Sequence, residues 1–165
     1  MLDIPAQYTR RIRTIGFYQI IGGGVGLLMM GWALSTNEAS KGILIFTASG
    51  CLLLGFSIVC GWGLLNGDKR ALPLSIINQS LQIIMIGIGG FLFKYCAGLY
   101  VMLGIKFIDE LKMTADIGLS TFELNINSGE QGAVSFNLIA ILLFISLLRL
   151  QEQIKQYYLL KKGIG

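Results

Sequence analysis

Four long runs without a charged residue dominate the pattern of hydrophobic and polar positions. They cover residues 14–37, 42–67, 71–93 and 131–148. A helix needs about 18–20 apolar residues, at 1.5 Å per residue, to cross roughly 30 Å of hydrocarbon. Each run has about that length, so the pattern predicts an all-α membrane protein with four transmembrane helices in two antiparallel hairpins.

The polar segments between these runs divide the chain. Short connections, such as Asn66–Arg70 with its glycine and charges, place consecutive helices side by side as antiparallel neighbours. The division that we predict is a cytoplasmic leader over 1–13, transmembrane helices 1 to 3 within 14–95, an extracytoplasmic loop over 96–131, transmembrane helix 4 over 132–150, and an amphipathic cytoplasmic tail over 151–165.

The loop between the third and fourth helices carries a different period. Phe122, Leu124 and Ile126 alternate with polar residues, which is typical of a half-buried strand. Residues 133–136 either pair back as a second strand or already belong to the fourth helix, and residues 100–108 are a candidate third strand. We therefore expect a small β-containing element outside the cytoplasm.

Composition supports a membrane protein. The chain is 54% hydrophobic and 13% charged, with a mean hydropathy of +0.70, whereas an ordinary soluble domain carries about 25% charge. The net charge of +4 comes from residues at the ends of the apolar runs. No basic patch is interleaved with aromatic residues, so nucleic acid is not an expected partner.

The distribution of lysine and arginine predicts the orientation. With the N-terminus inside, the cytoplasmic segments hold most of the basic residues, as the positive-inside rule requires. These are Arg10, Arg11, Arg13, Lys69, Arg70, Arg149, Lys155, Lys161 and Lys162. The prediction is a multi-pass plasma-membrane protein with both termini in the cytoplasm, and its short external loops are compatible with a bacterial inner membrane.

The residue inventory offers little for catalysis. The chain has no histidine, which removes Ser-His-Asp catalysis and imidazole metal sites. The four predicted helices contain no Asp or Glu, and the three cysteines lack the spacing of metal ligands. We predict no catalytic residue, no cofactor and no metal, and expect that the protein is not an enzyme.

The densest polar group lies in the third run. Ser75, Gln79 and Gln82 share one helix face at i, i+4 and i+7, and Asn78 and Gln82 are also four residues apart. Three interpretations remain open: hydrogen bonds between helices, contact with a partner helix, and the lining of a ligand cavity.

Lys94 is the only charge within a long apolar context. Its first interpretation is an interfacial lysine at a helix end, with its charge reaching the headgroups; the second is a buried pair with an external acid such as Asp109 or Glu110. Gly22 and Gly26 form a GxxxG pair, which predicts close helix packing.

These features are surfaces rather than a catalytic arrangement. They predict a non-enzymatic integral membrane subunit or scaffold, whose partners are the lipid bilayer and other membrane proteins, or further copies of itself. The alternative is a small transporter or channel component with a polar path lined by the amides of the third helix.

Overall fold

The computed structural model describes residues 6–36, 41–108, 110–126, 132–161 and 163 of the 165-residue chain. Four helices and four strands make up this part. They are α1 (Ala6–Thr36), α2 (Lys41–Leu65), α3 (Ala71–Leu81), β1 (Ile84–Ile88), β2 (Phe91–Ile108), β3 (Glu110–Ile126), β4 (Gly132–Asn137) and α4 (Leu138–Lys161).

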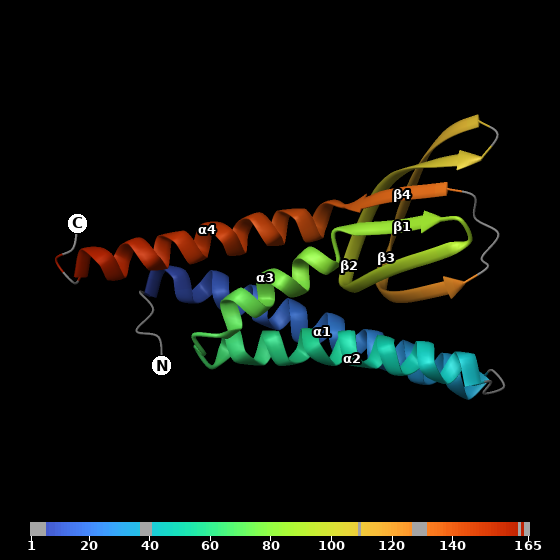
Figure 1. Ribbon diagram of the computed structural model, residues 1–165. Coiled ribbons are helices and arrows are strands. Elements are labelled where there is room, and N and C mark those ends of the chain that lie inside the picture. Colours follow the sequence, from blue (N-terminus) through green and yellow to red (C-terminus); the bar gives the residue numbers. More distant parts are fainter. Residues whose placement is uncertain (1–5, 37–40, 109, 127–131, 162, 164–165) are drawn as a thin grey trace.

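The helices and the sheet share one elongated body. Helices α1 and α2 form a long antiparallel hairpin along one side, while α3 and α4 cover one half of it and the sheet covers the other (Figure 1). Helix α1 begins near one end of this body, and α4 ends at the same end (Figure 1). Apolar side chains from α1, α2, α3 and α4 form a core at that end; they are Ile12, Ile15, Leu64, Ala71, Leu72, Leu147, Leu150 and Ile154.

The sheet is antiparallel and nearly closes on itself. Its strand order is β1-β4-β2-β3, and β1 also pairs with the beginning of β2. Strand β2 achieves this by bending, because its register shifts between Cys96 and Leu99 and Gly98 has a φ of +112°. A positive φ of this kind favours glycine. The first half of β2 therefore meets β1 and the second half meets β4, while β3 follows β2 on both sides of the bend.

The prediction of an all-α protein with four transmembrane helices is wrong. The third predicted helix, within 71–93, ends at Leu81, and Ile84–Ile88 is strand β1. Isoleucines suit a pleated strand, and Gly89 and Gly90, with φ of 60° and 84°, turn the chain into β2. Only α1 and α2 are long and apolar enough to cross a membrane, judged by length and composition within the described residues.

The fourth predicted helix is also only partly helical. Gly132–Asn137 is strand β4, which pairs with both β1 and β2. Helix α4 begins after Asn137, whose Oδ1 accepts the backbone N–H groups of Ile139 and Ala140 at 3.2 and 3.4 Å. Asparagine in this position satisfies amides that the first helical turn leaves free. The strand expected around 122–126 lies in β3, but the sheet is far larger than the small element predicted.

Candidate functional site

Two polar clusters lie inside this apolar molecule. The first, which we call the amide cluster, joins the helices to the sheet, and each of its side chains is at most 2% exposed. It consists of Gln19, Ser57, Ser75, Asn78, Gln79, Gln82 and Tyr95. The second, the lysine cluster, lies inside the curved sheet and consists of Lys94, Tyr100, Asp116 and Glu123.

Hydrogen bonds of the amide cluster tie α3 to the long hairpin. Ser75 Oγ donates to Gln19 Oε1 of α1 at 3.1 Å, and Asn78 Nδ2 donates to Ser57 Oγ of α2 at 3.1 Å. Ser57 Oγ in turn donates to the backbone oxygen of Gln19 at 3.2 Å. Paired polar groups in a dry interior hold neighbouring helices in one arrangement.

The same cluster reaches the sheet through two further residues. Tyr95 Oη of β2 lies 2.7 Å from the Leu53 carbonyl oxygen and 2.9 Å from Asn78 Oδ1. One phenolic proton serves one of these oxygens at a time. Gln82 Oε1 accepts the backbone N–H of Ala97 at 2.8 Å. The predicted polar face of 75–82 thus contacts α1, α2 and β2.

Gln79 differs from its neighbours. It is fully buried, and neither Nε2 nor Oε1 has a hydrogen-bond partner among the described residues; the same holds for Gln19 Nε2. Buried amides are almost always paired. Of the four residues on the predicted polar face, Ser75, Asn78 and Gln82 make hydrogen bonds within the protein. Gln79 alone keeps both its amide groups without a hydrogen-bond partner among the described residues.

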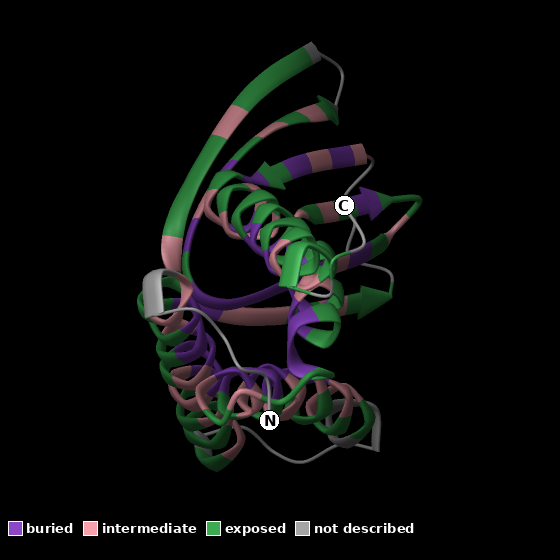
Figure 2. Ribbon diagram, turned by 90° about the vertical axis from the view of Figure 1, so that its left-hand side faces the viewer, coloured by how far each residue is buried: buried purple, intermediate pink, exposed green. Residues whose placement is uncertain are grey.

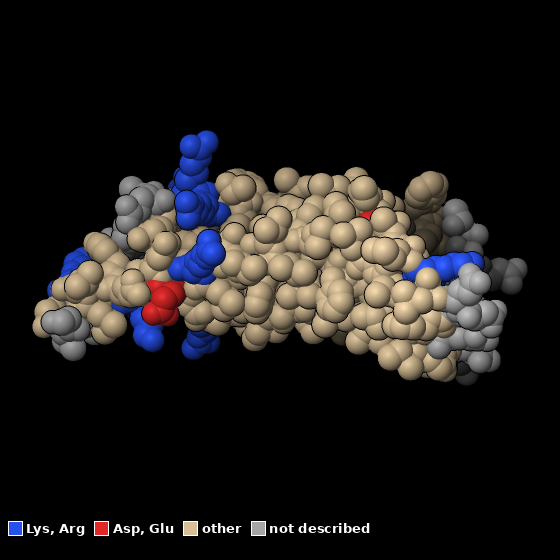
Figure 3. Space-filling model, turned by 90° about the horizontal axis from the view of Figure 1, so that it is seen from above, with Lys and Arg blue, Asp and Glu red and all other residues tan. Residues whose placement is uncertain are grey.

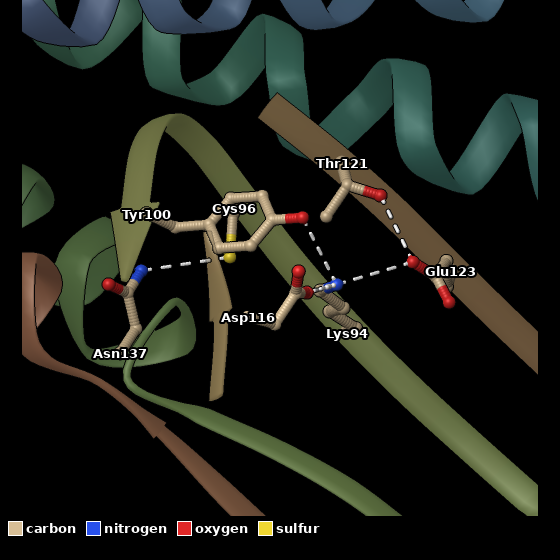
Figure 4. Close-up of polar contacts among 7 residues, drawn as sticks. All are labelled: Lys94, Cys96, Tyr100, Asp116, Thr121, Glu123 and Asn137. Atoms are coloured by element: carbon tan, nitrogen blue, oxygen red, sulfur yellow. Dashed lines mark hydrogen bonds and ion pairs between the residues drawn. The ribbon is translucent and has the colours of Figure 1, made fainter. Parts of the chain in front are cut away.

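The lysine cluster has a dense set of contacts around one ammonium group (Figure 4). Lys94 Nζ lies 2.7 Å from Asp116 Oδ2, 3.5 Å from Glu123 Oε1 and 3.3 Å from Tyr100 Oη. Lys94 is 6% exposed, whereas the side chains of Asp116 and Glu123 are 52% and 45% exposed. The buried charge is therefore matched by two carboxylates at the edge of the sheet interior.

Strand register explains why these residues meet. In the β2–β3 pair, Lys94 is opposite Glu123, and Met102 is opposite Asp116. Opposite charges across neighbouring strands stabilise the pairing. The prediction that Lys94 ends a transmembrane helix is wrong, because Lys94 lies within β2. The alternative prediction paired Lys94 with an external acid such as Asp109 or Glu110. Asp109 and the side chain of Glu110 lie outside the described residues.

Electrostatics favour the charged forms of Lys94 and Asp116. Burial lowers the pKa of Lys94, but the hydrogen bonds with Asp116 and Tyr100 and the charge of Glu123 outweigh it and raise the pKa above its usual range. The hydrogen bond from Lys94 lowers the pKa of Asp116. Burial raises the pKa of Tyr100 although Lys94 opposes it. The arrangement is a fixed ion pair rather than a proton-transfer pair poised near neutral pH.

The cysteine beside this cluster is not activated. Asn137 Nδ2 lies 3.6 Å from Cys96 Sγ, and burial raises the pKa of the Cys96 thiol to about 12 (Figure 4). A protonated, buried thiol is a poor nucleophile. Within the part of the chain that the structure describes, no group of His, Cys, Asp or Glu is arranged to hold a metal ion.

Two cavities adjoin the lysine cluster, and Glu123 lines both. One, of about 390 Å³, lies within the sheet and is lined by Met85, Leu92, Lys94, Met102, Lys106, Thr114, Ala115, Asp116, Glu123 and Ser135. The other, of about 590 Å³, is a more apolar groove between α1, α2 and β3.

Gly26 borders this groove, and a Cβ there would overlap Leu54 of α2. A Cβ at Gly22 would overlap the backbone of Ala97 and Gly98, so this glycine packs against the sheet.

The outer surface of the sheet is the feature that our sequence reasoning missed. Large apolar side chains are exposed on all four strands, whereas Lys94, Ser120, Ser135 and Asn137 of the same sheet are buried. Figure 2 shows how exposed and buried positions are distributed along the strands. The exposed apolar residues are Ile84, Ile86, Ile88, Phe91, Leu99, Leu103, Ile105, Phe107, Leu111, Met113, Ile117, Leu119, Ile126 and Phe136. The signal was present in the alternation of Leu111, Met113 and Ile117 with polar residues, which has the same period as 122–126.

Comparisons of this chain with protein-family models, with curated proteins and with solved structures found no match. The function is therefore argued from the geometry described above.

Proposed function

We propose that this chain is a non-enzymatic subunit embedded in a membrane, where it associates with other membrane proteins. The observation that carries the proposal is the reversed polarity of the sheet, with exposed apolar side chains outside and an ion pair inside. A sheet facing water presents the opposite arrangement. Contiguous apolar surface of this kind marks contact with lipid or with another protein.

The two long helices extend the same apolar surface. On α1, four large exposed side chains recur at helical spacing, and four more do so on α2. They are Phe17, Ile21, Leu28 and Trp32 on α1, and Ile45, Leu52, Val59 and Trp62 on α2. These stripes support a hairpin in contact with hydrocarbon.

The charges support an orientation. Seen from above, Lys and Arg gather at the end where α1 begins and α4 finishes, and the middle of this face is nearly free of charged side chains (Figure 3). Exposed basic residues of that end are Arg10, Arg11, Arg13, Lys69, Arg70, Arg149 and Lys155. By the positive-inside rule this end lies in the cytoplasm, with both termini.

Association with protein, rather than lipid alone, is favoured by the edge of the sheet. Within the described residues, β3 pairs only with β2. An open strand edge leaves backbone groups unpaired, and these are not tolerated against lipid. A protein partner on this edge would satisfy them.

Membrane extraction combined with copurification tests the proposal. We expect the tagged chain to stay in membranes washed with alkaline carbonate, and to copurify in mild detergent as a stoichiometric complex. Release into the wash, or a detergent-stable monomer without a crosslinked partner, would contradict it.

A transporter or channel component is the second candidate, and Gln79 favours it. Its buried amide, which has no partner among the described residues, has the hydrogen-bonding capacity that a polar path requires. This alternative predicts that cysteines replacing Gln79 and Gln82 react with a water-soluble thiol reagent in membranes. Protection of both cysteines would count against a path along α3.

A further inference from the structure

We infer that the partner on the β3 edge is a second copy of this chain, which pairs antiparallel with β3 about a twofold axis at Thr114. This inference rests on the proposed function, whose partner it names. The result is a continuous sheet across two copies, with the curved sheets on either side of the axis.

The available edge is the first half of β3. At Ser120 the strand is held by the helical hairpin, because Ser120 Oγ donates to the Gly22 carbonyl oxygen at 2.7 Å. Before that point Leu111, Met113, Ile117 and Leu119 are 67%, 88%, 69% and 57% exposed. A long apolar edge strand of this kind is a template for pairing with another strand.

The sequence of this segment is complementary to itself. A twofold axis at Thr114 places Leu111 opposite the second copy's Ile117 and Met113 opposite its Ala115. Both pairs lie on the apolar face, as register in a two-sided sheet demands. On the polar face, the same axis places Lys112 opposite Asp116, twice.

Charge selects this register over its neighbours. An axis at residue 112 would place two copies of Lys112 opposite each other, and an axis at residue 116 would do the same with Asp116. Like charges directly opposite destabilise strand pairing, while opposite charges stabilise it. Asp116 is available for a second ion pair because its side chain is 52% exposed although it already contacts Lys94.

Disulfide crosslinking measures this geometry directly. Residues paired across antiparallel strands have Cα atoms about 4.5–5.5 Å apart, which is within the range that a disulfide bridges. We expect Thr114→Cys, in a Cys51→Ser background that removes the exposed native thiol, to form a disulfide-linked dimer in membranes under mild oxidation.

The neighbouring positions are matched controls. Met113→Cys alone places its thiols on diagonal positions about 7–8 Å apart, beyond disulfide reach. It should crosslink only when coexpressed with a differently tagged Ala115→Cys chain. Adding Lys112→Glu to Thr114→Cys should weaken dimerisation about tenfold, because two symmetry-related ion pairs are lost, whereas adding Lys155→Glu should not.

The outcomes separate this inference from the proposed function. Three results would overturn the β3 dimer without contradicting membrane insertion. The first is equal crosslinking of the Met113→Cys and Thr114→Cys chains, and the second is a crosslink from the Thr114→Cys chain to a different protein. The third is a folded Thr114→Cys variant that does not crosslink, together with a monomeric mass for the unmodified chain. Crosslinking of a Thr114→Cys chain that alkaline carbonate releases would support the dimer and overturn the membrane proposal.

Discussion

Lys94 shows how a single charge is accommodated in an apolar molecule. Its ammonium is nearly buried, and its 2.7 Å contact with Asp116 and the nearby Glu123 and Tyr100 supply the polar groups that water would otherwise provide. Taking an ion out of water costs several kcal/mol unless it is paired. The cluster therefore stabilises the curved sheet only as a complete set.

Replacing Lys94 by methionine should destabilise the protein. The two carboxylates would lose their counter-ion, but each is about half exposed and can be hydrated. We therefore expect a loss of about 1–3 kcal/mol, measured by urea unfolding in detergent, and a nonzero coupling energy with Asp116→Asn. Lys155→Met on the exposed side of α4 is the control and should change stability by less than about 0.5 kcal/mol; equal effects of the two substitutions would refute a stabilising role for the cluster.

Acid should weaken the same contact. The pKa of Asp116 is lower in the folded state than in the unfolded state because Lys94 donates a hydrogen bond to its carboxylate. A depressed folded pKa contributes stability above the unfolded value, about 3.9, and this contribution is lost as the pH falls through the folded value. The melting temperature of the wild type should fall more steeply than that of Asp116→Asn below about pH 4. Parallel pH curves would show that Asp116 does not contribute.

At the scale of elements, the sheet and the helical hairpin are held together at close backbone approaches. Gly22 of α1 lies against Ala97 and Gly98 at the bend of β2, next to the hydrogen bond from Ser120 to the Gly22 carbonyl. Tyr95 forms the other junction, because its Oη lies 2.7 Å from the carbonyl oxygen of Leu53 in α2. A side chain at the first junction has no space, because the neighbouring atoms belong to backbone.

Gly22→Ala should therefore separate α1 from the sheet. Overpacking against backbone costs about 1–3 kcal/mol. Gly24, two residues along the same helix, has nothing within 4 Å of an added Cβ, so Gly24→Ala should be neutral or stabilise by up to about 1 kcal/mol through helix propensity. Thermal unfolding of both variants in detergent provides the comparison, and a Gly22→Ala protein as stable as Gly24→Ala would refute the packing described here.

Sequence reasoning predicted the two long helices, part of the sheet and part of each cluster. The helices expected near 14–35 and 42–65 lie within α1 and α2. Long apolar runs with few strand signals favour a helix over a strand. The run through Ile83–Ile88 has no period that distinguishes a helix from a strand, and its pairing with β4 decided the outcome. The shared face of Ser75, Gln79 and Gln82 followed from spacing, whereas the partners of Lys94 depended on the β2–β3 register.

At the scale of the whole molecule, two polar clusters lie beneath a surface that exposes many large apolar side chains. The amide cluster and Lys94 are buried, while the carboxylates of Asp116 and Glu123 are about half exposed. The stripes of α1 and α2 and the outer face of the sheet are apolar, and basic residues gather at one end (Figure 3). This distribution suits a protein surrounded by lipid and by other chains, which requires that the outer face is covered.

Thiol labelling in intact membranes tests most directly whether this apolar outer face is covered. In a Cys51→Ser background, Leu103→Cys on β2 and Leu28→Cys on α1 place thiols where the apolar side chains are 47% and 76% exposed; Lys155→Cys marks the basic end. We predict that a membrane-impermeant maleimide labels the Lys155→Cys chain in inside-out vesicles, and labels the other two variants only after the membranes are dissolved and the protein is denatured. Labelling of the Leu103→Cys and Leu28→Cys chains in intact vesicles as fast as the Lys155→Cys chain would contradict a covered outer face.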